Sequence, residues 1–182
     1  MSIFLFVPGL RDHVEDHWQT HLARRLPVSI TVPQLERDKL SCSARVAALE
    51  ETYTRITQPV ILVAHSAGVM IAVHWARRFA HRVQGALFAA PADLELPLPV
   101  GYPAFEDIQA NGWLPIPRQR LPFPTLVVAS TNDPLARLER VQGYAQDWGA
   151  QLVNAGAVGH LNPAAGFGEW PMAEALLQQL QR

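Results

Sequence analysis

Residues 61–76 read ILVAHSAGVMIAVHWA. The run from Ile61 to Ala64 has the composition of a buried strand, and from Ala67 onward the apolar spacing becomes that of a helix. Ser66 lies at this junction, with the small residues Ala64 and Gly68 two positions before and two positions after it. A serine on a sharp turn from strand to helix has the form of a nucleophile elbow, in which the backbones approach closely. The stretch therefore predicts a sheet-and-helix protein with an exposed serine at the end of a strand.

The same stretch also has a simpler interpretation. A serine is a common helix N-cap, and the pattern small-x-Ser-x-Gly is frequent in proteins. The usual elbow has glycine where this chain has Ala64, which leaves slightly less room at the turn. The interpretation therefore depends on what the rest of the chain supplies.

Apolar runs of strand length alternate with helix-length segments along the whole chain. Such alternation indicates an α/β fold, a mostly parallel sheet of about six strands with helices on both faces. A length of 182 residues suits a single domain over residues 1–182. The predicted strands are Ile3–Val7, Val28–Val32, Val60–Ala64, Gly85–Ala90, Thr125–Ala129 and Gln151–Asn154. The predicted helices are Asp16–Arg25, Ser41–Ile56, Ala67–Ala80, Leu135–Trp148 and Pro171 to about Gln181.

Composition excludes several classes of protein. The formal net charge is −1 and no basic block occurs, which argues against nucleic acid or an anionic membrane as the partner. Cys42 is the single cysteine, so neither a disulfide framework nor a zinc site of cysteines is possible. The apolar start MSIFLFVPGL has no basic leader and is interpreted as a strand, and a cytoplasmic location is expected. No apolar run approaches the roughly 20 residues of a membrane span.

Two later turns hold the partners that a nucleophilic serine needs. Asp133 follows a predicted strand in VVASTNDPLA, and His160 follows the last strand in GAVGHLNP. The order Ser66, Asp133, His160 is that of a hydrolase triad, and all three residues should meet at one edge of the sheet. Taken alone, Asp133 can be a helix N-cap and His160 an ordinary loop histidine. Asp93 also follows a strand, but Asp133 is favoured as the acid because its strand should adjoin the last one.

The backbone supplies candidate donors for an oxyanion. The helix after Ser66 points its first amides at the serine, so the N–H of Ala67 is one donor. The second should come from the turn after the first strand, FVPGLRDH, where Gly9 permits the turn and Leu10 offers its N–H.

The remaining histidines do not form a recognisable site. The spacing of His13, His17 and His21 can place imidazoles on one helix face, but it is not that of a zinc-binding H-E-x-x-H motif, and His13 precedes the helix. No metal and no cofactor are therefore expected. The side chain of His65 should point away from Ser66, and that of His74 should serve packing.

One stretch departs from the alternation. Residues 91–124 hold eight of the 15 prolines, so 93–124 are predicted to form an irregular, rigid segment. Because this segment follows the end of a strand, it should form a wall of the ligand pocket, with Tyr102, Phe105 and Trp113 as apolar side chains.

The motifs together resemble a known family. The fragments FVPGL…DHWQ, LVAHSAG…VHWA, FAAPAD, FPTLVVASTNDP, WGAQLVNAGAVGHLN and GFGEWP are similar, in order, to the small serine hydrolases that include the retinoblastoma-binding serine hydrolase and bacterial YdeN-type proteins. The resemblance covers nearly the whole chain. It implies a compact α/β-hydrolase fold without a large lid, with Ser66 as nucleophile, Asp133 as acid and His160 as base.

Two further functions stay open beside the main interpretation. The main interpretation is a serine hydrolase, a carboxylesterase of small acyl esters with a preference for compact acyl groups. An amidase or peptidase would use the same triad. A non-enzymatic protein-binding module on a hydrolase scaffold is the third possibility. The retinoblastoma-binding relative is named for a Leu-x-Cys-x-Glu motif, and residues 40–44 of this chain, LSCSA, end in Ala44 instead.

Overall fold

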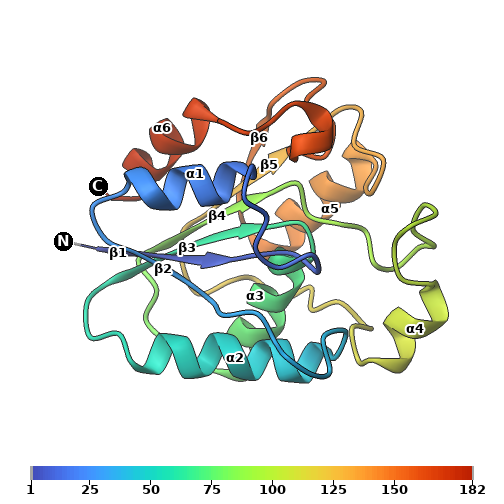
Figure 1. Ribbon diagram of the computed structural model, residues 1–182, viewed down its shortest axis with the longest axis horizontal. Helices are drawn as coiled ribbons and strands as arrows, with labels where there is room; N and C mark the ends of the chain where they lie inside the picture. Colours follow the sequence, from blue (N-terminus) through green and yellow to red (C-terminus); the bar gives the residue numbers. More distant parts are fainter. Residues whose placement is uncertain (1, 182) are drawn as a thin grey trace.

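The computed structural model describes residues 2–181, and these form one six-stranded sheet with helices on both faces (Figure 1). All the strand pairs are parallel, and the strand order is β2-β1-β3-β4-β5-β6. The predicted α/β fold with a parallel sheet is confirmed. The strands are β1 (Ile3–Val7), β2 (Ser29–Thr31), β3 (Val60–His65), β4 (Gly85–Ala89), β5 (Thr125–Ala129) and β6 (Gln151–Asn154).

The helices form two layers around this sheet. Helices α1 (Trp18–Arg25) and α6 (Pro171–Leu180) cover one face (Figure 1). Helices α2 (Cys42–Thr54), α3 (Ala67–Arg78) and α5 (Leu138–Trp148) cover the other face. The described residues also contain two short helical segments, α4 (Phe105–Ala110) and the 3₁₀ turn η1 (Pro163–Ala165).

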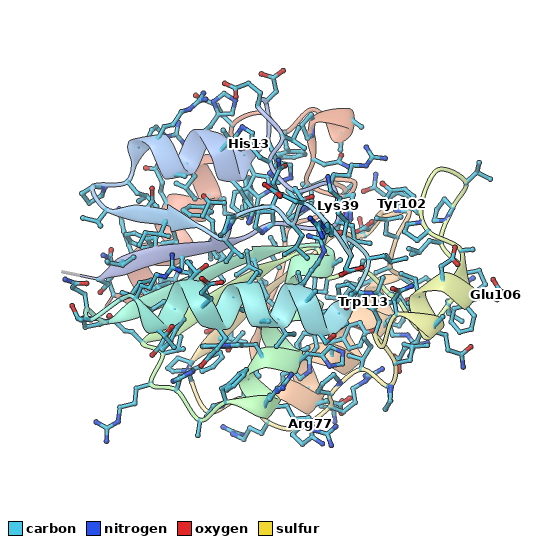
Figure 2. The ribbon with its side chains drawn as sticks, turned by 60° about the horizontal axis from the view of Figure 1, so that its bottom comes forward. His13, Lys39, Arg77, Tyr102, Glu106 and Trp113 are labelled. Atoms are coloured by element: carbon cyan, nitrogen blue, oxygen red, sulfur yellow. The ribbon has the colours of Figure 1, made fainter. Side chains whose placement is uncertain are left out.

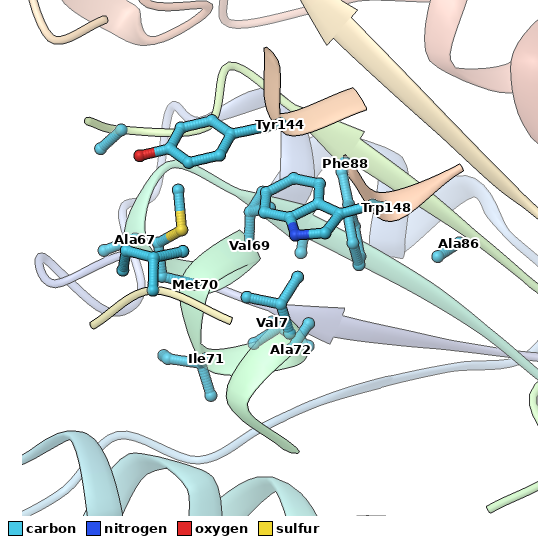
Figure 3. Packing of buried hydrophobic residues seen from close by; sticks show 14 of the residues in the cluster. Val7, Ala67, Val69, Met70, Ile71, Ala72, Ala86, Phe88, Tyr144 and Trp148 are labelled. Carbon is cyan, nitrogen blue, oxygen red and sulfur yellow. The ribbon is translucent and has the colours of Figure 1, made fainter. Parts of the chain in front are cut away.

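The central strands are apolar on both sides because both faces of the sheet are covered. In β3, Ile61 and Val63 belong to the core under α1 and α6, while Leu62 and Ala64 belong to the core under α2, α3 and α5. Successive side chains of a strand point to opposite faces, which explains why the sequence shows continuous apolar runs here. Figure 3 shows the second core, where the ring of Trp148 meets Phe88 edge-on and stacks on Tyr144.

The proline-rich segment differs from its prediction. Residues 93–124 were expected to be irregular throughout, but they contain helix α4, which buries Ile108. The cause is visible in the sequence, since no proline occurs between Pro103 and Pro115 and the chain is free to form a helical turn there. None of the helices in residues 2–181 is long and apolar enough to cross a membrane.

Helix α3 begins unusually close to the end of β1, and Gly68 makes this possible. A Cβ atom placed on Gly68 would lie 2.1 Å from the carbonyl oxygen of Val7 and 2.7 Å from that of Pro8. Both neighbours are backbone atoms, so they cannot rotate away as a side chain does. Glycine is therefore required where the helix carrying the elbow packs against the first strand.

Replacing Gly68 should destabilise the protein strongly. The change Gly68→Ala should lower the free energy of unfolding by about 3 kcal/mol, because the methyl group overlaps two backbone carbonyls. The matched control is Gly143→Ala in α5, where an added Cβ meets nothing within 4 Å. That substitution should raise the free energy of unfolding by about 0.5–1 kcal/mol through its higher helix propensity. Urea denaturation measures both values, and equal stability of the two variants would contradict this account of α3 packing.

Candidate active site

Ser66 occupies a strained backbone turn between β3 and α3. Its φ is 58° and its ψ is −128°, a conformation that residues other than glycine rarely adopt. The N–H of Ser66 donates to the carbonyl oxygen of Ala89 at 3.1 Å, which holds the turn against β4. Ala64 stands where the usual elbow has glycine. It is fully buried, and it pairs with Val7 of β1 and Phe88 of β4 in the sheet. The extra methyl group is thus accommodated without disturbing the turn.

The three residues predicted as a triad lie within hydrogen-bond distance of one another. The Oγ atom of Ser66 is 2.9 Å from Nε2 of His160. Nδ1 of His160 is 3.0 Å from Oδ1 and 2.9 Å from Oδ2 of Asp133. Because the carboxylate accepts the Nδ1–H, Nε2 is left to accept the hydroxyl proton of Ser66. The side chains of His160 and Asp133 are only 5% and 2% exposed, so the contact between these two residues is shielded from water.

The alternative acid, Asp93, lies in a different network. Its Oδ2 is 2.9 Å from Nε of Arg140, and its Oδ1 accepts from the N–H of Glu95 and from the hydroxyl of Tyr144. These contacts tie the start of the proline-rich segment to α5. The structure therefore brings Asp133, and not Asp93, to the imidazole.

The loop that carries His160 is held by two side chains that the sequence analysis did not single out. Oδ1 of Asn132 accepts from the N–H of Gly159 at 2.7 Å, and Oγ of Ser130 accepts from the N–H of Val158 at 3.2 Å. Ser130 in turn donates to Asn132 at 2.9 Å. The signal for this role is the polar run Ser-Thr-Asn-Asp at the end of β5, which joins the acid to the residues that position the base.

The two predicted oxyanion donors come from elements that meet at Ser66. A Cβ on Gly9 would lie 3.3 Å from Cβ of Ser66, so the loop after β1 passes directly beside the serine. Within residues 2–181 no group accepts a hydrogen bond from the N–H of Leu10 or Ala67. Ala67 is also the first residue of α3, where the helix dipole favours negative charge. Neither amide is therefore engaged within these residues, and the loop and the helix that carry them meet at Ser66.

The side chain of Arg45 stabilises the loop after β1. Its guanidinium is buried and lies 2.7 Å from Oδ1 of Asp12, and it also donates to the carbonyl oxygens of Lys39 and Leu10. Asp12 has a φ of 56°, so this turn too is held in a left-handed conformation. The ion pair thus fixes the peptides that follow Gly9.

Ser66 and His160 open into a cavity of about 540 Å³, a size typical of small-molecule sites. One wall is apolar and comes from the loops after β1, β4 and β5. It includes Leu10, Ala92, Leu94, Leu98, Tyr102 and Leu135. The proline-rich segment contributes to this wall as predicted, and Figure 2 shows Tyr102 in the loop before α4.

Two of the aromatic residues predicted for this wall lie elsewhere. Trp113 is fully buried beside the start of α2, where its Nε1 donates to the carbonyl oxygen of Leu40 at 2.7 Å. Phe105 begins α4 and does not line the cavity. Both were misplaced because α4 turns this part of the segment away from the serine.

A second wall of the same cavity was not predicted. It comes from α1 and the edge strand β2, on the other side of Ser66. It includes Phe6, Gln19, Thr20, Ala23, Ser29 and Thr31. No motif marks these residues, because they come together only through the packing of α1 over β1 and β2.

Three histidine rings pack in a row beside the serine. The ring centroids of His160 and His65 are 4.8 Å apart, and those of His65 and His17 are 4.6 Å apart. Nε2 of His65 lies 2.8 Å from the carbonyl oxygen of His160. His65 therefore leans toward the His160 loop, a supporting role that the sequence analysis missed.

Burial keeps the rings of His65 and His17 neutral. It lowers the pKa of His65 well below its usual value, and the nearby His160 adds to this effect. Burial, followed by the charge of His160, lowers the pKa of His17 to about 4. Neutral His65 can then donate its Nε2–H to the carbonyl oxygen of His160. Neutral His17 caps α1, because its Nδ1 accepts a hydrogen bond from the N–H of Gln19.

The histidines weighed as metal ligands do not form a cluster. His17 turns inward as the cap of α1, while His13 is exposed and contacts Glu15. No group of three or more metal-ligating side chains occurs within the described part of the chain. Cys42 is buried, which raises the pKa of its thiol to about 12 and leaves it unreactive at neutral pH.

His17 should make stability depend on pH. Its folded-state pKa of about 4 lies below the unfolded value of 6.5, so protonation favours the unfolded chain. The effect is absent above about pH 6.5 and grows as the pH falls toward 4; at about pH 5 it lowers the free energy of unfolding by about 2 kcal/mol. His17→Asn keeps a capping oxygen but does not titrate. Urea denaturation above about pH 6.5 and again at about pH 5 measures the free energy of unfolding of both proteins. Between these two conditions it should fall by about 2 kcal/mol less in the variant than in the parent protein. His65 titrates in both proteins, so an unchanged pH dependence would count against a neutral, buried His17.

Comparison with known proteins gives the family. The sequence pattern of the family described as "Serine hydrolase" matches residues 4–179. A crystal structure from Pectobacterium atrosepticum, described as a YdeN-like hydrolase, is 35% identical, with a TM-score of 0.84 over 99% of this chain and 90% of that one. No curated protein matches this chain significantly.

More distant structures share the fold. The ydeN gene product of B. subtilis is 16% identical, with a TM-score of 0.76 over 98% of this chain and 97% of that one. The RedJ thioesterase from Streptomyces coelicolor is 17% identical, with a TM-score of 0.66 over 99% of this chain and 89% of that one. Since the family pattern spans nearly all of the sequence and a solved relative is 35% identical along it, the chain belongs to the serine hydrolase family.

Proposed function

We propose that this serine hydrolase is a carboxylesterase that acts on small acyl esters through an acyl-enzyme. The observation that carries the proposal is the 2.9 Å contact between Oγ of Ser66 and Nε2 of His160, whose Nδ1 faces the buried carboxylate of Asp133. A serine hydroxyl becomes an effective nucleophile when such a base accepts its proton.

The reaction proceeds in two halves. Oγ of Ser66 attacks the ester carbonyl while Nε2 of His160 takes the hydroxyl proton, and Asp133 stabilises the imidazolium. The carbonyl oxygen becomes an oxyanion, which the N–H groups of Leu10 and Ala67 bind. The alcohol leaves with the proton of Nε2. A water molecule then loses a proton to Nε2 and attacks the acyl carbon; the bond from this carbon to Oγ breaks, Nε2 returns the proton to Oγ of Ser66, and the acid is released.

The apolar wall of the cavity supports a compact acyl group. Leu94, Leu98 and Tyr102 close the side of the cavity that the proline-rich segment covers. Aliphatic and aromatic side chains of this kind bind a short acyl chain by excluding water from it. The segment is anchored through Asp93 and Glu95 to α5, so this wall is fixed in place.

Ser66 should be the one serine that a fluorophosphonate probe labels. Ser66→Ala removes the nucleophile and should abolish labelling and ester hydrolysis, while thermal unfolding stays close to that of the parent protein. Ser43→Ala is the control, since Ser43 is an exposed residue of α2 outside the cavity and should leave labelling intact. A Ser66→Ala protein that is still labelled would disprove the assignment of the nucleophile.

Matched substrates separate the esterase from an amidase. The protein should hydrolyse para-nitrophenyl butyrate and leave the corresponding butyryl anilide essentially unchanged, because the amine is the poorer leaving group. The ratio of kcat/KM values measures this preference. Faster hydrolysis of the anilide would point to an amidase, and neither turnover nor labelling would point to a binding module.

Asp133 should act as the triad acid, and Asp93 should act only in the fold. Asp133→Asn should lower kcat by up to about 10⁴-fold, because an amide favours the wrong tautomer of His160. Asp93→Asn should change kcat far less and instead lower the free energy of unfolding, since it weakens the ion pair between the buried Asp93 and the half-buried Arg140. Steady-state kinetics and urea denaturation of both variants give the two readouts. Loss of turnover in Asp93→Asn with retention in Asp133→Asn would reverse the assignment.

A further inference from the structure

The cavity extends from Ser66 along a groove between α1 and the edge strand β2. Ser29 of β2 pairs with Phe4, which pairs with Ile61 of β3, and Ser66 lies five residues beyond Ile61. At about 3.3 Å per residue, the wall at Ser29 therefore lies about 16 Å behind the serine along the strand direction. If a compact acyl group binds against the proline-rich segment, it does not fill this groove.

The groove has an apolar floor and polar sides. Phe6 lies beneath it, in register with Thr31 of β2. The hydroxyl of Ser29 donates to the carbonyl oxygen of Ala23, and that of Thr20 donates to the carbonyl oxygen of Val14. A hydroxyl that donates its proton keeps lone pairs that can accept a hydrogen bond. The sides therefore suit a chain that carries both carbon and oxygen atoms.

His17 adds a donor where the groove starts. Its Nδ1 accepts from the backbone of Gln19, so the proton of the neutral ring is on Nε2. Within residues 2–181 no group accepts a hydrogen bond from this Nε2, although the residue is only 8% exposed and lines the cavity. An oxygen atom of a bound ligand can accept from it.

The row of histidines indicates which part of an ester enters the groove. Nε2 of His160 gives its proton to the oxygen of the departing alcohol, so this oxygen must lie against His160. The rings of His65 and His17 continue the same wall from His160 to the start of the groove. The chain attached to that oxygen therefore passes along these rings toward α1 and β2.

We propose that the groove between α1 and β2 binds the alcohol part of the substrate, and that this alcohol is an extended chain with ether or hydroxyl oxygens. The proposal rests on the esterase function above. It assigns the two walls of the cavity to the two halves of one ester, with the compact acyl group on the apolar wall and the longer, hydrogen-bonding alcohol in the groove.

Three soluble esters test this arrangement. The first is methyl butyrate, and the second is the butyrate of triethylene glycol monomethyl ether, which adds a long polar alcohol. The third is the methyl ester of an acid that contains a triethylene glycol chain, so its long polar chain is on the acyl side and its alcohol is methanol. The parent enzyme should have the highest kcat/KM for the second ester and the lowest for the third.

Thr31→Trp should narrow the groove. Thr31 is an exposed strand residue on the groove wall, and strands accommodate aromatic side chains well. The ratio of kcat/KM for the glycol butyrate to that for methyl butyrate should fall about tenfold or more. The control is Gln34→Trp, at an exposed position outside the cavity, which should leave the ratio unchanged. His17→Asn, which keeps the helix cap but removes the Nε2 donor, should lower the ratio in the same direction.

Each outcome decides the proposal. A parent enzyme that prefers the third ester, or a Thr31→Trp change that lowers turnover of the third ester instead of the second, would show that the groove takes the acyl chain and would overturn the assignment. Equal ratios in the parent enzyme, Thr31→Trp and His17→Asn would also overturn it. The proposed function fails separately, through absence of methyl butyrate hydrolysis and of Ser66 labelling.

Discussion

The close contact between the start of α3 and the end of β1 is the constraint on which the site depends. Gly68 lets the helix approach the carbonyl oxygens of Val7 and Pro8, and this brings the loop after β1 to the side of Ser66. The proposed oxyanion donors, the amides of Leu10 and Ala67, belong to two elements separated by 57 positions in the sequence, and this contact brings those elements together at Ser66. The proposed oxyanion site would thus be a consequence of helix packing.

The strained turn at Ser66 is stabilised by its surroundings. A residue in this conformation carries about 1–3 kcal/mol of strain and persists only where neighbouring elements fix it. Here β3 is fully buried between β1 and β4, and the amide of Ser66 is bonded to Ala89. In the loop after β1, the buried pair of Arg45 and Asp12 holds a second left-handed turn. The candidate site therefore depends on the buried centre of the sheet and on this ion pair.

The fold and the candidate triad were predictable because each follows from local pattern. Apolar runs mark the buried strands, and polar turns after β3, β5 and β6 mark Ser66, Asp133 and His160. The second wall of the cavity was not predictable, since it depends on how α1 packs over β2. The role of His65 was hidden for a similar reason. Its partner is the carbonyl oxygen of a residue 95 positions later, and no local pattern encodes such a contact.

Burial of His65 and His17 has a consequence for the proposed chemistry. His160 becomes positively charged when it accepts the proton of Ser66, and two imidazole rings lie along the wall beside it. Had His65 or His17 been charged at neutral pH, each would oppose that charge at short range, because the His160 ring is itself buried. Because burial holds both rings neutral, Asp133 is the charged partner that the imidazolium of His160 meets. His17 can then present its Nε2–H, and both rings an uncharged surface, to the substrate, so that the proposed wall would serve proton transfer at the His160 end and recognition of a polar chain at the His17 end.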